Sequence, residues 1–375
     1  MRKVRRLGIF VFYDASGIVD LYIQELLKSL LSELNKLVIV VNGKITNNCR
    51  QVLEKYSNNI FIRENKGFDA GAYKEFFLNF MPSEDLEQWD EVLLFNDTFY
   101  GPLVPWEVVF KRMEKEEGLD FWGLSRYNED SFSNKRSTYP SHIQSYFLVC
   151  RKSLLSNPCF LKFWNGFDYT INRREATEQF EIRFSVYFTE KGFIGKAYTE
   201  VCDKNIEMEP GCISYIDYPY ELLSELRFPV IKKQAITVDN FKKARKALDY
   251  IEKNTNYDMN LIYKHLTRLA QENRIVALFN PIRLEMFCIE HKRIFIYGHG
   301  KIGTNLAEFF DYKGWNFEGF LVSEKSEQKK DVFCYYNMKF SRDDGIILAL
   351  GRKAYQEVFP VVKKDLQMSQ LFLPY

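Results

Sequence analysis

Short apolar runs alternate with amphipathic stretches along the first hundred residues. The runs are rich in β-branched and aromatic residues, which is typical of strands buried inside a protein. They predict four strands, at residues 7–13, 37–41, 60–63 and 92–95. The stretches between them carry apolar residues at three- and four-residue spacing and predict helices, one capped by Asp20 and two over 48–56 and 73–80. This alternation indicates an α/β fold whose parallel sheet is covered by helices on both faces.

The pattern becomes mixed after residue 120 and restarts near the C-terminus. The middle predicts strands at 121–124 and 145–149, a polar loop at 125–141, and helices at 160–167 and 177–191. A charge-rich helical connector follows to about residue 288. The end predicts a strand, a glycine turn, a helix and two more strands, at 293–297, 298–303, 304–313, 317–322 and 345–350. We therefore expect three parts, at residues 1–233, 234–290 and 291–375.

Composition places the chain among ordinary globular proteins. Its 375 residues are 46% hydrophobic and 27% charged, enough for more than one core. The aromatic share of 16% fits thick cores, or platforms for flat ligands such as sugars and bases. The seven cysteines are scattered and never form CxxC, so we expect reduced thiols and a cytoplasmic location. The apolar run at 7–13 is too short for a signal peptide, and no run approaches the roughly 18 residues that span a bilayer.

The charge is nearly balanced overall but uneven along the chain. The formal net charge of +2 excludes a dedicated nucleic-acid binder. Residues 228–293 hold 13 basic and 7 acidic side chains, a net of +6, and four basic residues lie at the N-terminus: Arg2, Lys3, Arg5 and Arg6. Two interpretations remain open: peripheral contact with the acidic inner face of a membrane, or solvated helix faces, which are commoner.

Two polar loops follow the third and fourth predicted strands, at 63–71 and 96–102. Ligands of such sheets bind beyond the carboxyl ends of the strands, so these loops mark the first place to look. In the second loop Asp97 stands between Asn96 and Thr98, and such oxygen donors suit Mg²⁺ or Mn²⁺ bridged to a phosphate. An Asx turn before Gly101 explains the same residues equally well.

The glycine turn near the C-terminus has the pattern GxGxxG, with glycines at 298, 300 and 303. A strand before it and a helix after it are the context in which Gly298, Gly300 and Gly303 would let a phosphate approach the helix N-terminus. Glu324 stands where a ribose-binding acid is expected. The unit is short for a full dinucleotide fold, so a tight turn in a packing or regulatory domain is the alternative interpretation.

A carboxylate pair, Glu178 and Glu181, lies at i, i+3 spacing on the helix predicted over 177–191. On an α-helix both would share one face, where either could act as a general base toward a sugar hydroxyl. A solvated surface is the competing explanation. The four histidines show no zinc-ligand spacing, and neither GxSxG nor a Walker A sequence occurs, which excludes zinc enzymes, serine hydrolases and P-loop kinases.

Several stretches in chain order also carry a resemblance to a known family. They are 64–73 (Glu-Asn-Lys-Gly-Phe-Asp-Ala-Gly-Ala-Tyr), 94–102 (Leu-Phe-Asn-Asp-Thr-Phe-Tyr-Gly-Pro), 142–147, 160–164, 181–182 and 228–233. Together they resemble the rhamnan synthesis protein F family of glycosyltransferases, over about residues 5–235. The resemblance implies a GT-A-like, Rossmann-related mixed sheet. It also implies transfer of a sugar, rhamnose in the named family, from a nucleotide donor during cell-surface polysaccharide synthesis. We expect the glycine-turn domain to lie outside the match.

The resemblance also assigns roles to individual residues. It places the donor, a dTDP- or UDP-linked sugar, against these side chains: Asn65, Lys66, Asp69, Gly71 and Asn96. It places a polysaccharide or lipid-linked glycan acceptor beside these: His142, Gln144 and Ser145. Asn96-Asp97 would occupy the place of the metal-binding DxD, but Phe95 replaces the first acid. Glu181, with Glu178 as second choice, would be the base, and Asp97, alone or with Mg²⁺ or Mn²⁺, would face the leaving diphosphate.

Two further functions compete with a glycosyltransferase. A non-catalytic partner in a polysaccharide assembly complex would need no complete DxD, and would bind a donor without turnover or not at all. An NAD-dependent oxidoreductase built on the glycine turn would need catalytic residues near it, and the sequence offers His299 alone.

Overall fold

The structure is a computed structural model that describes residues 4–81, 83–128, 139–170, 172–202, 204, 206–208, 212–237, 241–272, 281–324 and 331–373. The chain folds into two compact units, each described by itself below. One comprises Met1–Ala235 with Asp249–Tyr257, and the other Ile236–Leu248 with Asp258–Tyr375. The division into three parts at residues 233 and 290 stays a prediction.

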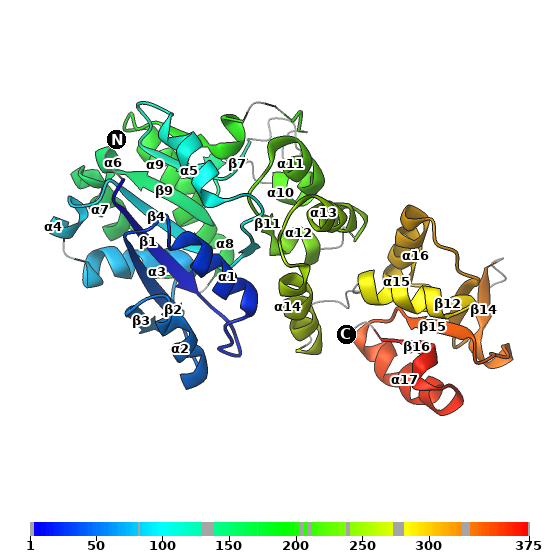
Figure 1. Ribbon diagram of the computed structural model, residues 1–375. Coiled ribbons are helices and arrows are strands. Elements are labelled where there is room, and N and C mark those ends of the chain that lie inside the picture. The colour runs from blue at the N-terminus through cyan, green and yellow to red at the C-terminus, as the bar shows by residue number, and fades with distance from the viewer. Residues whose placement is uncertain are drawn as a thin grey trace. The chain divides into compact units, whose positions relative to one another are not determined.

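The first unit is built on a seven-stranded sheet (Figure 1). In spatial order its strands are β10 (Gly195–Ala197), β6 (Phe121–Gly123), β9 (Phe147–Arg151), β4 (Glu91–Asn96), β1 (Arg6–Phe12), β2 (Lys36–Asn42) and β3 (Asn59–Arg63). Strands β1 to β4 are parallel, whereas β9 runs antiparallel to both β4 and β6. The order β3-β2-β1-β4 is that of the first half of a doubly wound sheet. The expected α/β class with a mixed sheet flanked by helices is confirmed.

The helices of this unit alternate with the strands, as the periodicity predicts. Its α-helices are α1 (Leu21–Leu30), α2 (Asn47–Glu54), α3 (Phe68–Glu75), α4 (Ser83–Leu86), α5 (Trp106–Glu114), α6 (Lys152–Leu155), α7 (Pro158–Asn165), α8 (Arg173–Ala176), α9 (Arg183–Thr189), α10 (Ser214–Asp217), α11 (Pro219–Leu226) and α12 (Lys233–Thr237). Two segments are π-helical, η1 (Phe76–Phe80) and η2 (Thr177–Ile182), and η3 (Tyr198–Glu200) is a 3₁₀ turn. A π-helix has a wider turn, so η2 departs from the single α-helix expected over 177–191.

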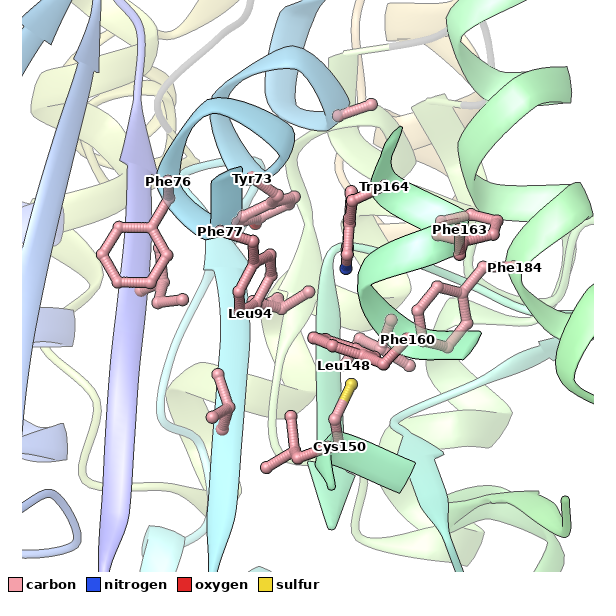
Figure 2. Close-up of a cluster of buried hydrophobic side chains, with 14 of the residues drawn as sticks. Tyr73, Phe76, Phe77, Leu94, Leu148, Cys150, Phe160, Phe163, Trp164 and Phe184 are labelled. Atoms are coloured by element: carbon pink, nitrogen blue, oxygen red, sulfur yellow. The ribbon is translucent and has the colours of Figure 1, made fainter. Parts of the chain in front are cut away.

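Aromatic side chains fill the core on one face of the sheet. Figure 2 shows rings from α3 and η1 meeting rings from α7 and α9 above strands β4 and β9. Phe77 lies 5.1 Å from Trp164 and 4.9 Å from Phe160, measured between ring centroids. The high aromatic content therefore serves the core here, and it fixes α3 against the sheet edge where the polar loops begin.

Two short two-stranded sheets accompany the large one. β5 (Phe99–Tyr100) pairs antiparallel with β11 (Ile231–Lys232), and β7 (Arg126–Tyr127) pairs with β8 (His142–Ile143). The sequence pattern predicted none of them, because two-residue strands leave no periodic signal. The β5–β11 pair matters most, since it joins the loop after β4 to a segment more than a hundred residues away. Much of the loop predicted at 125–141 lies outside the described residues.

The second unit holds a parallel sheet of its own (Figure 1). Its strands, in spatial order, are β14 (Val332–Cys334), β13 (Gly319–Val322), β12 (Arg293–Tyr297), β15 (Asp344–Leu348) and β16 (Leu371–Phe372). The remaining elements are α13 (Phe241–Asn254), which both units share, α14 (Met259–Gln271), α15 (Pro281–Glu290), α16 (Lys301–Lys313), α17 (Arg352–Asp365), η4 (Tyr335–Asn337) and η5 (Met368–Gln370). The expected Rossmann-like order is present, with β12 at its centre.

The N-terminal basic cluster is partly structural. Arg6 is buried, and its guanidinium bonds Glu91 at 2.8 Å and Glu114 at 3.1 Å. Arg5 pairs with Asp90. A buried, paired arginine cannot face a membrane, so Arg6 drops out of the expected contact. Within the described residues, no helix is both long and apolar enough to cross a bilayer.

Candidate functional site

Buried polar side chains end three of the four parallel strands β1 to β4, at one edge of the large sheet. Asn42 ends β2, Arg63 ends β3 and Asn96 ends β4. Arg63 donates to Asn42 Oδ1 at 2.6 Å and to the Lys66 carbonyl at 2.8 Å, while Glu75 accepts from its Nε. These bonds hold the loop after β3 against the sheet, since buried polar groups need partners.

Two glycines shape that loop. Gly67 precedes α3 in the left-handed conformation, with φ +72°. A Cβ on Gly71 would lie 2.0 Å from the Lys66 carbonyl oxygen, so only glycine fits there. The Lys66 side chain is exposed and pairs with Glu64, and Asn65 Oδ1 is buried without a hydrogen-bond partner in the described residues. Gly71 and the Lys66 backbone therefore shape the donor loop expected here, and the Lys66 ammonium points to solvent.

Asn96 connects this loop to the one after β4. Its Nδ2 donates to Asp69 Oδ2 at 2.5 Å, and its Oδ1 accepts from the backbone and the hydroxyl of Thr98. The structure thus contains the Asx turn expected as one alternative. It also brings Asp69, Asn96 and Asp97 to one edge, as predicted from the strand order.

Asp97 forms an ion pair with Lys233. Lys233 Nζ donates to its Oδ2 at 3.0 Å and to the Tyr22 hydroxyl at 2.9 Å, and that hydroxyl donates to the Asp97 carbonyl oxygen at 3.1 Å. Burial, followed by the charge of Asp97, raises the pKa of Tyr22, so its phenol keeps its proton. The carboxylate is largely covered, with 14% of its side chain exposed.

The residues around Asp97 do not fit a metal ion held by the protein. Phe95, at the missing acid's position, is fully buried. Where the structure describes the chain, no three side chains of His, Cys, Asp or Glu gather as a metal site. The Oδ2 atom of Asp97 already accepts from an ammonium. Hard divalent cations need several oxygen ligands, and this edge offers a carboxylate paired with a lysine instead.

A second lysine lies beside the first. Lys232 Nζ donates to Thr98 Oγ1 at 2.5 Å and lies 4.0 Å from the ring centroid of Tyr146 and 5.5 Å from that of Tyr215. Burial lowers its pKa to about 7, although the charges of Glu181, Asp69 and Asp97 act in the opposite direction. Those carboxylates therefore share one electrostatic environment with Lys232.

Glu181 is fixed by Ser145, which follows β8, and by His142 of β8 itself. Ser145 donates its backbone N–H at 2.7 Å and its hydroxyl at 2.6 Å to Oε2, and His142 Nε2 lies 3.6 Å from Oε1. Burial raises the pKa of Glu181, but His142 and these Ser145 bonds outweigh it, and the pKa is lowered overall. Glu181 is thus an oriented, ionised carboxylate. His142 Nδ1 bonds the Pro140 carbonyl, which leaves Nε2 on the side of Glu181.

The other two residues expected on this side have different surroundings. Gln144 is buried, and its Oε1 accepts from Ser125, whose hydroxyl also bonds the Tyr146 hydroxyl. Glu178 lies on the half-exposed rim, where it accepts from Tyr139 at 3.0 Å and from Arg174 at 2.9 Å. The segment η2 that carries both glutamates is π-helical, and their pairing partners differ.

The glycine turn of the second unit follows β12. Gly298 has φ +111°, and a Cβ on Gly303 would lie 1.8 Å from the Gly298 carbonyl oxygen, so packing requires both glycines. A Cβ on Gly300 would meet nothing within 4 Å. Glu324 is exposed after β13. The turn opens α16 as predicted, and its ligand stays a prediction.

Sequence reasoning missed Lys232, Lys233, Tyr22 and Tyr146. The two lysines stand in the stretch 228–233, which the family resemblance includes, but the sequence marks them only as part of the basic segment 228–293, for which solvated helix faces are the commoner interpretation. The available signal was adjacent lysines after an apolar run, Val230-Ile231, which is typical of a strand end. Tyr22 lies on a helix face that periodicity assigns to the core.

Comparison with known proteins gives a family match over most of the chain. The family model described as "Rhamnan synthesis protein F" matches residues 37–332. The match ends almost a hundred residues later than expected and includes the glycine turn. The expectation that the C-terminal domain lies outside it is therefore wrong.

The curated relatives are partial matches. An uncharacterized protein, y4gN, of Sinorhizobium fredii is 27% identical over 190 residues, which are 50% of this chain and 46% of that protein. Virulence protein VirA of Vibrio anguillarum is 26% identical over 175 residues, 46% of this chain and 52% of that protein. The chain thus spans about half the length of the curated relatives it matches.

Solved structures show distant likenesses. A 4-diphosphocytidyl-2C-methyl-D-erythritol synthase from Anaerococcus prevotii has TM-score 0.34 and 12% identity, over 52% of this chain and 89% of that one. Glucosyl-3-phosphoglycerate synthase from Mycobacterium tuberculosis, in complex with Mn²⁺, UDP and phosphoglyceric acid, has TM-score 0.24 and 12% identity, over 40% and 57%. Core-mannan synthase A from Aspergillus fumigatus, in its Mn/GDP form, has TM-score 0.25 and 9% identity, over 42% and 63%. These scores are low, and we assign no ligand or reaction from them.

Proposed function

The chain belongs to the rhamnan synthesis protein F family, and on this premise we propose that it is a glycosyltransferase. It moves rhamnose or another hexose from a dTDP- or UDP-linked donor to a hydroxyl of a growing cell-surface polysaccharide or lipid-linked glycan. The observation that carries the proposal is the set of polar contacts at one edge: Asp69 accepts from Asn96, Asp97 pairs with Lys233, and the buried Lys232 contacts Thr98 and Tyr146, the residue after the Ser145 that fixes Glu181. Such a grouping offers hydrogen-bond acceptors for sugar hydroxyls, a cation for phosphate and a base for the acceptor.

The donor would lie at the edge formed by the loops after β3 and β4. Asp69 and Asn96 hold these loops together at the carboxyl ends of the strands, where ligands of doubly wound sheets bind. Asp97 keeps Lys233 in place and accepts hydrogen bonds, a role that needs no metal ion. Binding of Mg²⁺ or Mn²⁺ there is not part of the proposal, because the surroundings do not fit it.

Glu181 would take the proton of the acceptor hydroxyl. Its carboxylate is ionised and held by Ser145, so one oxygen keeps a fixed direction. As the acceptor oxygen bonds to the anomeric carbon, its proton passes to a Glu181 oxygen, and the nucleoside diphosphate leaves with the electron pair of the broken bond. The cytoplasmic, membrane-peripheral location stays a prediction of the same proposal.

The test measures release of nucleoside diphosphate from dTDP-rhamnose, UDP-glucose and UDP-galactose by the full-length chain, with a glycan acceptor mixture. Glu181→Gln keeps the size of the side chain and removes the base. We expect donor binding within about threefold of the wild type and a turnover rate lowered about a hundredfold or more. Glu190→Gln, an exposed glutamate on the same helical region, is the matched control.

Three other results would change the assignment. An equal loss in Glu178→Gln with full activity in Glu181→Gln would move the base to Glu178. Donor binding without turnover in any condition would favour the non-catalytic assembly partner. Hydride transfer with NAD, and no binding of nucleoside diphosphates, would replace the proposal with an oxidoreductase centred on the glycine turn.

A further inference from the structure

The fold brings an unusual pair of adjacent lysines to the donor edge. Backbone pairing of β11 with β5 sets Lys232 opposite Phe99, and the Lys233 N–H donates to the Thr98 carbonyl. Both ammonium groups therefore lie against the loop after β4, which carries Asp97. The two side chains have separate tasks there, because Lys233 is paired with Asp97 whereas Lys232 is not.

Lys232 is a buried cation with donors to spare. Only 7% of the surface of Lys232 is exposed to solvent. An ammonium carries three N–H donors. In the described residues, the Lys232 ammonium makes one hydrogen bond, to the Thr98 hydroxyl. The rings of Tyr146 and Tyr215 provide the remaining contact. A buried charge without a carboxylate in contact is costly, so a protein keeps it where a ligand completes the pairing.

An anion fits this position better than any other ligand. Spare N–H donors bind phosphate oxygens, and Lys is a point charge for phosphate recognition. The fixed carboxylates nearby explain why the anion would need this cation: without it, Asp69 and Asp97 would repel a phosphate. A divalent ion is the other solution to that problem, but here the Lys233 ammonium already donates to Asp97 Oδ2.

We propose that Lys232 binds the diphosphate of the donor directly and takes the place of a divalent metal ion, with Lys233 and Asp97 as a positioning pair beside it. The inference rests on the proposed function. When the bond between the anomeric carbon and the β-phosphate oxygen breaks, its electron pair stays on that oxygen. Lys232 keeps its proton and stabilises the added negative charge, while the acceptor proton goes to Glu181.

The experiment measures affinities of dTDP, UDP and the corresponding monophosphates for the full-length chain by calorimetry, in EDTA and in Mn²⁺. Lys232→Met removes the charge and keeps the length of the side chain. Lys111→Met is the matched control, an exposed lysine paired with Glu107 on α5. We expect diphosphate affinity to be equal in EDTA and Mn²⁺ for the wild type and to fall about tenfold to a hundredfold in Lys232→Met. The affinity for the monophosphate should fall much less in the same variant.

Each other outcome overturns the inference in its own way. Diphosphate binding that needs Mn²⁺ and survives Lys232→Met would show that a metal does this work. An equal loss for mono- and diphosphate would show a structural role, as would failure of Lys232→Arg to recover part of the affinity. If no nucleotide binds to the wild type in any condition, the proposed function fails together with the inference.

Discussion

At the scale of single residues, the site combines polar groups of opposite charge that burial holds close together. Asp97 and Lys233 form an ion pair with 14% and 21% of their side chains exposed, and Glu181 takes two hydrogen bonds from Ser145. Such pairs keep both partners charged. Lys232 differs, because it contacts a hydroxyl and two rings, and burial disfavours its charged form.

The cost of burying the Lys232 charge predicts how the stability of the fold depends on pH. In the folded chain the pKa of Lys232 is about 7, below the ordinary value of 10.5, because burial disfavours the charged form. Between these values the unfolded chain binds more protons, so this residue makes stability rise with pH. Its penalty is complete below about 7 and vanishes above 10.5. Lys232→Met removes it, so the variant should gain most over the wild type at neutral pH.

Urea unfolding followed by tryptophan fluorescence at pH 7, 8 and 9 would measure this difference. We expect the advantage of Lys232→Met to shrink by up to about 1.4 kcal/mol for each pH unit. Lys111→Met, which is exposed, should show no such trend. A constant difference across the range would contradict the buried, uncharged state of Lys232 above pH 7.

At the scale of elements, short and irregular pieces do most to assemble the site. The two-residue strands β5 and β11 bring Lys232 to the loop after β4, and the π-helical turn η2 carries Glu178 and Glu181, whose hydrogen-bond partners differ. In the second unit, the glycine turn between β12 and α16 depends on backbone packing at two of its three glycines.

The glycine turn provides a matched pair of variants. Gly303→Ala puts a Cβ 1.8 Å from the Gly298 carbonyl oxygen, whereas Gly300→Ala enters open space. We expect Gly303→Ala to destabilise the second unit by about 2–4 kcal/mol and Gly300→Ala to stay within about 0.5 kcal/mol. Hydrogen exchange at the backbone amides of β12 measures the stability of this unit in each variant. Equal effects in both variants would refute the packing explanation of Gly303.

At the scale of the whole molecule, the two units each have a sheet with its own hydrophobic core. The family match extends from the first unit into the second as far as residue 332, so the glycine turn is part of what the family shares. In the parts of both units that the structure describes, side chains do not assemble a metal site.

This gives a prediction for metal removal. Because the described side chains hold no cage for a cation, EDTA should change the melting temperature of the full-length chain by less than about 1 °C, and Mn²⁺ without nucleotide should not raise it. Differential scanning calorimetry before and after dialysis against EDTA measures the shift. A fall of several degrees would show a bound metal that supports the fold.

The sequence by itself determined the local elements and the edge where the site lies. Apolar runs fixed four strands to within a residue or two at most ends, and the polar residues after them predicted the edge formed by Asp69, Asn96 and Asp97. These features follow from periodicity and strand order, which depend on near neighbours in the chain.

Only the tertiary structure decided which charges meet. The ammonium groups of Lys232 and Lys233 lie between 134 and 211 positions along the chain from their hydrogen-bond partners, and their pairing depends on two strands too short to leave a pattern. Likewise, Arg6 reads as a surface charge but is buried against Glu91 and Glu114. The energy of a charge depends on its burial and its partners in space, and neither is encoded within a window of neighbouring residues.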